Sequence, residues 1–275
     1  MRKMVCFDMD MTLLDHAVKK IPESALAAIQ SLKKQGHLVV IASGRDMDNE
    51  LSRPWADAVE PDAIVHSNGQ KVTVGRKVLK EVFMDGALIR RLVEFAKEHN
   101  FCLGFNIGRK GCYVHEEIIR DRERRVFKEP DREFIPVENL FSHPFYAMAL
   151  FGWKPEHTQE AARLVEEHFP ELKCPLFSRK EGADVIYRNV SKADGIRILM
   201  DYYGVEEKDV VAFGDSMNDI EMIREAGIGV AMGNAVEELK READFVTKAI
   251  GQDGIQYGLF KLGLLEDLDK PPLLS

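Results

Sequence analysis

The 275-residue chain has few cysteines and no long apolar segment, and both absences restrict what it can be. Its four cysteines are too far apart to form a Cys-x-x-Cys pair, which argues against a disulfide scaffold or a zinc site: Cys6, Cys102, Cys112 and Cys174. No stretch approaches the roughly 18 apolar residues that a membrane-spanning helix needs. The first ten residues lack the apolar region of a signal peptide. We therefore expect reduced thiols in a cytoplasmic protein with no membrane partner.

A surplus of positive charge is also absent. The chain has 38 Lys and Arg residues against 46 Asp and Glu residues, and its formal net charge is −8. Proteins that bind nucleic acid normally present a basic face, so no nucleic-acid partner is expected. The hydrophobic fraction of 45% fits one large domain or two ordinary ones. Composition does not separate a monomer from a homodimer.

Strand-like and helix-like segments alternate near both ends of the chain. The apolar runs 3–8, 37–43 and 62–69 are expected to be buried strands, and 22–36 has the apolar spacing of a helix. The C-terminal part repeats this order from residue 192 onward. Such alternation predicts an α/β core, in which a parallel, Rossmann-like sheet carries helices on both faces.

The middle of the chain follows a different pattern. A helix-like segment at 86–100 precedes two adjacent strand-like runs, 101–107 and 111–117, and a charge-rich stretch at 116–134 is expected to be a solvated helix or loop. Hairpin-like pairs mixed with helices predict an inserted α+β domain. We place this insert at 84–187, which leaves residues 1–83 and 188–275 for the core.

Three of the apolar runs end in polar residues. The first ends at Asp8 and Asp10, the second at Ser43, and a third, 209–214, at Asp215. Ligands bind at the carboxyl ends of the strands in open parallel sheets, so we expect these residues to share one crevice. Crowded carboxylates need a cation, and an all-oxygen ligand set favours Mg²⁺. Lys192 is the candidate for a second, fixed cation.

This combination of residues suits phosphoryl transfer. Asp8 could attack phosphorus as a carboxylate nucleophile. Asp10 could protonate the leaving oxygen and later activate water. The Ser43 hydroxyl, the Lys192 ammonium group and backbone N–H groups could hold the phosphoryl oxygens, where charge develops in the transition state.

Four ordered motifs carry a family resemblance. They are DMDMT at 8–12, IASGR at 41–45, VSKADG at 190–195 and GDSMND at 214–219, and the SNG at 67–69 adds to them. Together they resemble the motifs of the haloacid dehalogenase superfamily, in its Cof-type branch with a type IIB cap. The motifs span nearly the whole chain, and the insert has the length of that cap.

The resemblance implies a role for each matching residue. Asp8 would be the nucleophile, forming a phosphoaspartate, and Asp10 would be the general acid and base. The Mg²⁺ site would be formed by Asp8, the backbone carbonyl of Asp10, Asp215 and Asp219. Within it, Asp219 would support the water shell of the metal or orient its neighbours. Phosphate contacts would come from Ser43, Lys192, Asn218 and Thr12, and Thr12 would also stabilise the loop of the two aspartates.

Other readings stay open at several of these positions. Ser43 could be a helix N-cap, and Asp219 could simply be an acid in the first turn of a helix. Gly44, Arg45 and Asn68 are candidates for reaching substrate, although structural roles suit Arg45 and Asn68 equally well.

Outside the motifs, the signals are weaker. The family commonly has glycine where this chain has Met11, which leaves the local backbone geometry open. In the insert, only composition suggests substrate contacts at Arg109, His115, Arg120 and Tyr187. His66 and His115 show no partner pattern, so both are expected to be structural or exposed.

These observations predict an Mg²⁺-dependent phosphatase that acts on a small phosphorylated metabolite such as a sugar phosphate, through a phosphoaspartate. Two alternatives remain open. A phosphomutase would pass the same phosphoryl group to another hydroxyl of the substrate. A sensor would bind a phosphorylated metabolite without turnover.

Overall fold

A computed structural model of the chain describes residues 2–127, 133–177 and 179–265. They form two compact units. The first contains the residues up to Asp48, residues 52–81 and the residues from Ser191 onward, and the second contains residues 49–51 and 82–190. The limits of the second unit lie within three residues of the predicted insert, 84–187, apart from the short 49–51 segment.

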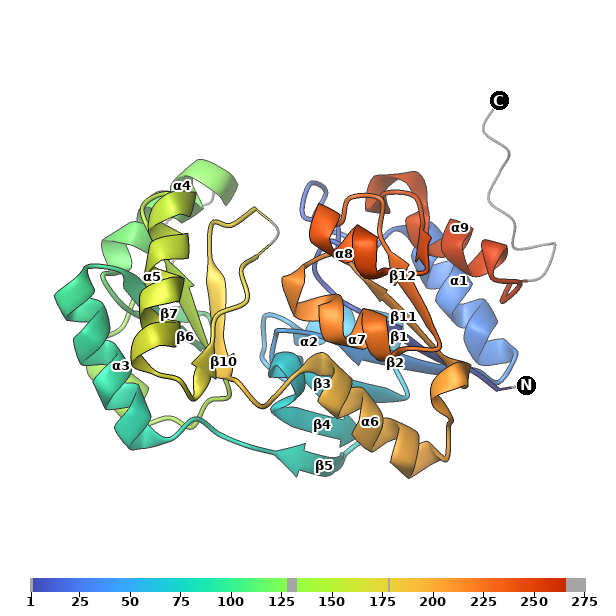
Figure 1. Cartoon of the computed structure of the whole chain (residues 1–275), viewed down its shortest axis with the longest axis horizontal. Helices are drawn as coiled ribbons and strands as arrows, with labels where there is room; N and C mark the ends of the chain where they lie inside the picture. Colours follow the sequence, from blue (N-terminus) through green and yellow to red (C-terminus); the bar gives the residue numbers. More distant parts are fainter. Residues whose placement is uncertain (1, 128–132, 178, 266–275) are drawn as a thin grey trace. The chain divides into compact units, whose positions relative to one another are not determined.

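Eight described strands form the sheet of the first unit (Figure 1). Their order is β13-β12-β11-β1-β2-β3-β4-β5, and the first six in this order are parallel. The parallel strands are β1 (Met4–Phe7), β2 (Leu38–Ala42), β3 (Ala63–His66), β11 (Val210–Gly214), β12 (Ile228–Ala231) and β13 (Phe245–Val246). Strands β1, β2 and β11 are buried along their whole length, which explains their uninterrupted apolar sequences.

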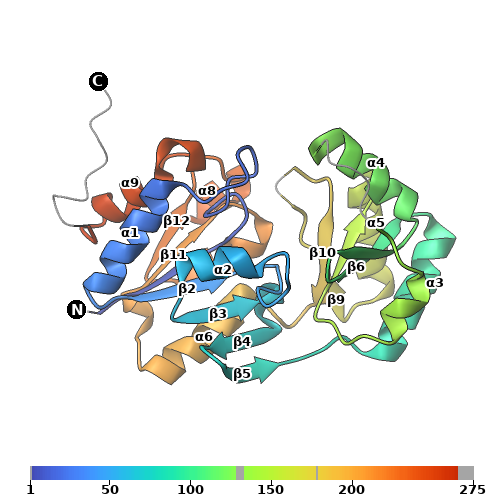
Figure 2. The same ribbon diagram turned by 180° about the vertical axis from the view of Figure 1, so that it is seen from behind.

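An antiparallel hairpin extends this sheet and was not predicted. Strands β4 (Lys71–Val74) and β5 (Lys77–Glu81) follow β3 in space and run antiparallel to their neighbours (Figure 2). Gly75, with φ +54°, lies in the turn between them. The hairpin is rich in lysine because β5 is a largely exposed edge strand, so its sequence lacks the apolar run of a buried strand.

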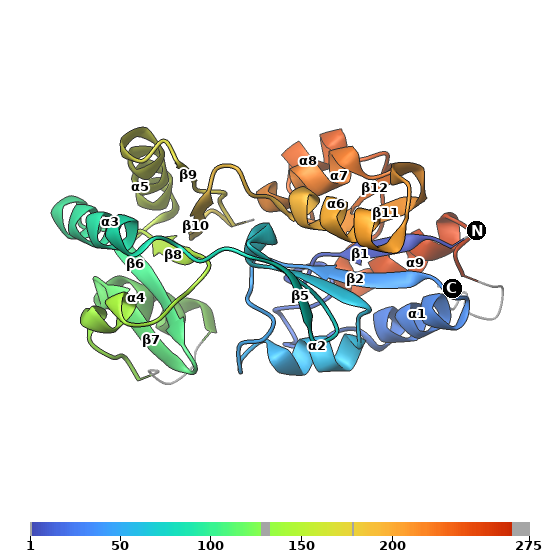
Figure 3. The same cartoon turned by 90° about the horizontal axis from the view of Figure 1, so that it is seen from below.

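Helices cover both faces of the sheet, as predicted for an α/β core. Figure 3 shows α6 (Lys192–Tyr203), α7 (Ile220–Glu225) and α8 (Glu237–Glu242) on one face. The other face carries α1 (Glu23–Lys34), α2 (Arg53–Val59) and α9 (Gly254–Lys261). None of the helices in the described ranges combines the length and apolar character needed to cross a bilayer.

The second unit has the expected α+β character. Its described strands form an antiparallel sheet in the order β7-β6-β8-β10-β9. The strands are β6 (Cys102–Ile107), β7 (Lys110–Val114), β8 (Met148–Phe151), β9 (Leu172–Lys173) and β10 (Ala183–Tyr187), and the helices are α3 (Gly86–His99), α4 (Glu116–Phe127) and α5 (Pro155–His168). The charge-rich stretch therefore begins as a helix, and its residues 128–132 lie outside the described residues.

The four cysteines are buried free thiols, as expected. Cys6 packs in the core of the first unit, and the other three pack inside the second. Burial raises the pKa of the Cys6 thiol, which keeps it protonated and unreactive.

Candidate active site

The three predicted strand ends meet at one edge of the sheet. β1 lies between β2 and β11, and Phe7 is level with Ile41 on one side and Phe213 on the other. Because all three strands are parallel, the residues that follow them emerge at the same edge. The Asp8 N–H donates to the Phe213 carbonyl over 3.0 Å, which extends the ladder to the first candidate residue.

Lys192 connects two of the acidic motifs. Its Nζ atom lies 2.6 Å from Oδ1 of Asp8 and 2.6 Å from Oδ1 of Asp219, and all three side chains are buried. An ammonium group has three N–H donors, so one remains after these two bonds. The carboxylates of two separate motifs therefore share one buried cation.

A close backbone contact positions this lysine at the start of α6. Ser191 is the N-cap residue, and its hydroxyl accepts a hydrogen bond from the Asp194 N–H. Gly69 adopts φ +97° against this end of the helix, where a Cβ atom would lie 2.1 Å from the Ser191 carbonyl oxygen. Only glycine fits this position, so the SNG turn fixes the beginning of α6 and, with it, Lys192.

Both carboxylate oxygens of Asp219 accept hydrogen bonds from neighbouring residues. Its Oδ2 atom accepts hydrogen bonds from the N–H groups of Asp215 (2.9 Å) and Ser216 (3.0 Å), while Oδ1 binds Lys192. With the Ser216 side chain it forms a capping box around the short 3₁₀ turn Met217–Asp219. Asp219 therefore lies in the first turn of a short helix, as one reading expected, and also binds Lys192, so its role toward a metal stays a prediction.

Asp8, Asp215 and Asp219 form a buried acidic group that could hold a metal ion. One carboxylate oxygen from each lies within 4.8 Å of the others. Three carboxylates against the single Lys192 ammonium group leave an excess of negative charge in a buried place, where unpaired charge is costly. A divalent ion with a preference for oxygen ligands fits this donor set and this charge.

The pKa values reflect the same excess of acid. Burial raises the pKa of Asp8 to about 7, against the opposing effect of Lys192 and with support from the nearby carboxylates. Burial, together with the charges of Asp8 and Asp219, raises the pKa of Asp215 well above its usual range. Burial alone would lower the pKa of Lys192, but Asp219 and Asp8 raise it above the ordinary value.

Asp10 lies in a different electrostatic environment. The Arg45 guanidinium group donates through Nε to Oδ2 and through Nη2 to Oδ1, each over 2.6 Å. His16 Nε2 also lies 2.6 Å from Oδ1. Burial alone would raise the pKa of Asp10, but Arg45 and His16 hold it well below its usual range. Asp8 and Asp10 therefore differ sharply in acidity although one residue separates them.

The two residues that contact Asp10, Arg45 and His16, were not predicted to do so. Arg45, a candidate for reaching substrate, is engaged with Asp10, so a substrate contact stays a prediction. His16 was missed, because it lies in a turn between Asp15 and Lys20 with no helical or strand periodicity to mark it.

The remaining motif residues form a hydrogen-bonded frame. The Ser43 hydroxyl accepts from the Arg45 N–H over 3.1 Å, and no helix begins at this strand end, since α2 starts at Arg53. The N-cap reading of Ser43 is therefore wrong. Asn218 donates through Nδ2 to Oδ1 of Asn68 over 2.9 Å, which joins two motif loops. Gly44 lies partly buried between Ser43 and Arg45.

Two features stand out in the loop after Asp10. Met11 has φ +62°, in the left-handed region that favours glycine, and its carbonyl accepts a hydrogen bond from Asn234 Nδ2 over 2.8 Å. The Thr12 hydroxyl is buried and has no hydrogen-bond partner among the described residues. Asn234 was another residue that the sequence motifs did not indicate.

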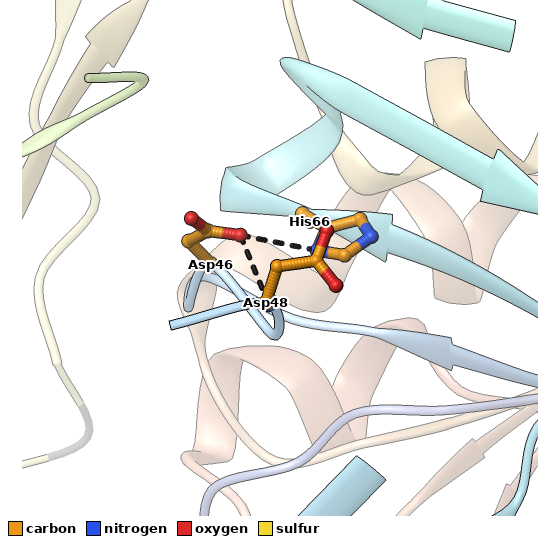
Figure 4. A group of neighbouring side chains, drawn as sticks. All are labelled: Asp46, Asp48 and His66. Atoms are coloured by element: carbon orange, nitrogen blue, oxygen red, sulfur yellow. Dashed lines mark hydrogen bonds and ion pairs between the residues drawn. The ribbon is translucent and has the colours of Figure 1, made fainter. Parts of the chain in front are cut away.

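A second group with ligand-type side chains lies nearby in the sequence but is already engaged (Figure 4). Asp46 and Asp48 follow β2, and His66 ends β3. His66 Nδ1 accepts the Met47 N–H over 3.1 Å, while Lys71 and Arg53 bind the two oxygens of Asp48. The buried His66 ring therefore has a structural role, as expected.

The residues suggested in the second unit each have a local partner. Arg109 pairs with Glu50, His115 with Glu117, and Arg120 with Glu116. The Tyr187 hydroxyl accepts a hydrogen bond from the Asp85 N–H. Their contact with substrate stays a prediction.

Comparison with known proteins identifies the family. The model of the haloacid dehalogenase-like hydrolases matches residues 5–259. The chain belongs to this family. YkrA of Bacillus subtilis, which is named as a candidate phosphatase, is 34% identical over 96% of this chain and 99% of its own.

Solved structures of the family agree with the fold. The phosphatase BT1666 of Bacteroides thetaiotaomicron is 27% identical, with a TM-score of 0.83 over 96% of both chains. The subclass IIB sugar phosphatase BT4131 is 26% identical, with a TM-score of 0.81 over 96% of this chain and all of its own. Family, fold and relatives together show that the chain is a phosphohydrolase.

Proposed function

We propose that this hydrolase is an Mg²⁺-dependent phosphatase of small phosphorylated metabolites, sugar phosphates among them, with a phosphoaspartate on Asp8. The observation that carries the proposal is the buried group in which Asp8 and Asp219 share Lys192 beside Asp215. The similarity to a sugar phosphatase supports the choice of substrate class. A cytoplasmic location and a monomeric or dimeric state remain predictions.

The proposed chemistry has two steps. A carboxylate oxygen of Asp8 attacks phosphorus, the bond from phosphorus to the leaving oxygen breaks, and protonated Asp10 gives its proton to that oxygen. Water then attacks the phosphoaspartate and returns a proton to Asp10, which releases phosphate and regenerates Asp8. Arg45 and His16 favour the ionised form of Asp10 in the free protein, which is the form it has between the two proton transfers. The negative charge of a bound phosphoryl group would favour the protonated form that the first transfer needs.

The hydrogen bonding of the Asp8 carboxylate suits its proposed role as the nucleophile. Oδ1 of Asp8 accepts the Lys192 bond, whereas Oδ2 accepts no hydrogen bond from the described residues and is open to attack phosphorus. The third N–H of Lys192, the Ser43 O–H and the Asn218 amide would hold phosphoryl oxygens. Thr12, whose hydroxyl has no hydrogen-bond partner in the described part of the chain, would be a further phosphate contact.

The metal ligands would be Asp8, Asp215 and the backbone carbonyl of Asp10, with Asp219 orienting the loop. When bound, a divalent ion would keep Asp8 ionised and neutralise charge on the phosphoryl oxygens. The buried carboxylate excess supports this assignment.

Phosphate release is the test. The purified protein would be assayed with glucose 6-phosphate, fructose 6-phosphate, ribose 5-phosphate, glycerol 3-phosphate and p-nitrophenyl phosphate, with Mg²⁺ and with chelator. We expect release with Mg²⁺ alone, no requirement for a bisphosphate activator, and complete loss in Asp8→Asn with the fold intact. Dependence on a bisphosphate would favour a mutase, and tight binding without turnover would favour a sensor.

A further inference from the structure

The His16 side chain breaks the symmetry of the contacts to Asp10. The Arg45 guanidinium group donates one 2.6 Å hydrogen bond to each carboxylate oxygen of Asp10, so these contacts do not distinguish the two oxygens. His16 Nε2, also at 2.6 Å, adds a second contact to Oδ1. An ionised carboxylate only accepts hydrogen bonds, so against that form of Asp10 the imidazole nitrogen is the donor. Among the contacts of the described residues, Oδ1 thus has two hydrogen-bond donors and Oδ2 has one.

The loop that carries His16 is fixed by its own hydrogen bonds. Asp15 and Lys20 exchange both backbone bonds, at 3.0 and 3.3 Å, which closes the four residues between them. Oδ1 of Asp15 also accepts the Ala17 N–H over 2.8 Å. His16 therefore occupies the base of a closed turn, and its ring can be held against Asp10 without support from a helix or strand.

We propose that His16 is a positioning residue for proton transfer by Asp10. With Arg45, it fixes Oδ1 as the held oxygen and leaves Oδ2 as the one that gives a proton to the leaving oxygen. The inference depends on the proposed phosphatase function. It extends that function because His16 lies outside the motifs that carry the family resemblance.

The test compares His16→Ala with His16→Gln, whose side-chain amide can restore a donor to Oδ1. Val18→Ala is the matched control, because Val18 lies in the same turn and is 61% exposed. Each variant would be assayed with p-nitrophenyl phosphate, whose leaving group needs little protonation, and with the alkyl phosphate of the panel that wild type hydrolyses fastest.

For His16→Ala we expect kcat on the alkyl phosphate to fall about tenfold or more, and kcat on p-nitrophenyl phosphate to fall by less than about threefold. KM and the melting temperature should change little, His16→Gln should recover most of the rate, and Val18→Ala should match wild type. Unchanged rates in His16→Ala, or equal losses on both substrates, would overturn the positioning role while leaving the phosphatase function intact. Wild type that releases no phosphate from any substrate would overturn both.

Discussion

Lys192 Nζ lies 2.6 Å from Oδ1 of Asp8, although 184 residues separate them along the chain. The same nitrogen binds Asp219, and no part of the lysine side chain is exposed. The buried cation thus holds the first and last acidic motifs together before any substrate binds. Its removal should affect stability as well as catalysis.

Lys192→Met should therefore be inactive and also less stable. The substitution leaves buried carboxylates without their cation, a change that typically costs about 3 kcal/mol. Chemical denaturation at pH 8 in chelator would measure the loss. Lys208→Met is the control, because Lys208 forms an exposed pair with Glu206 and should unfold like wild type. Equal stability of the two variants would contradict the structural role of Lys192.

Mg²⁺ should stabilise the folded chain through the acidic group at the strand ends. A ligand at about 100 times its Kd adds about 2.7 kcal/mol to the free energy of unfolding. We expect wild type to show a rise in melting temperature with Mg²⁺, and Asp215→Asn to lose it. Asp48→Asn should keep the rise, because the group of Asp46, Asp48 and His66 has its ligand atoms engaged. A response lost in Asp48→Asn and kept in Asp215→Asn would reverse the assignment of the site.

Without metal, the stability of the chain should depend on the ionisation of Asp8. Its pKa is raised to about 7, so between pH 4 and pH 7 the folded state binds a proton that the unfolded state has lost. The contribution of this group to stability therefore falls as pH rises through that window and stays low above it.

Asp8→Asn removes this titration and provides the comparison. In chelator, the melting temperature of the variant relative to wild type should increase from pH 4 to pH 8. Mg²⁺ at pH 8 should raise the melting temperature of wild type and reduce the difference. A difference that stays constant with pH would show that the Asp8 pKa is not raised.

Much of this site could be predicted because its residues occur where buried strands end. The apolar runs before Asp8, Ser43 and Asp215 indicated parallel strands, and parallel strands place their ends together. Local sequence could not show which side chains would pair across the site. The contact of Arg45 with Asp10 and that of Asn218 with Asn68 depend on loop conformations that no periodicity encodes.

Other features were missed for different physical reasons. The β4–β5 hairpin lies at an edge of the sheet, where solvent permits lysines and removes the apolar signal. His16 lies in a turn closed by backbone bonds, so no residue spacing marked it. The position of Met11 was recognised as unusual from its motif, but only the structure gives its left-handed φ.

The φ of +62° at Met11 allows the effect of backbone conformation on stability to be measured apart from the effect of losing the side chain. Met11→Ala and Met11→Gly remove the same partly buried side chain, but only alanine retains a Cβ that opposes the left-handed conformation. Met11→Gly should therefore be more stable than Met11→Ala by about 1 kcal/mol. The order should be reversed at Glu94, an exposed position inside α3, where alanine is favoured over glycine by about 1 kcal/mol. Denaturant unfolding of the four variants would measure both differences, and a Met11→Ala variant more stable than Met11→Gly would show that the backbone here is not left-handed.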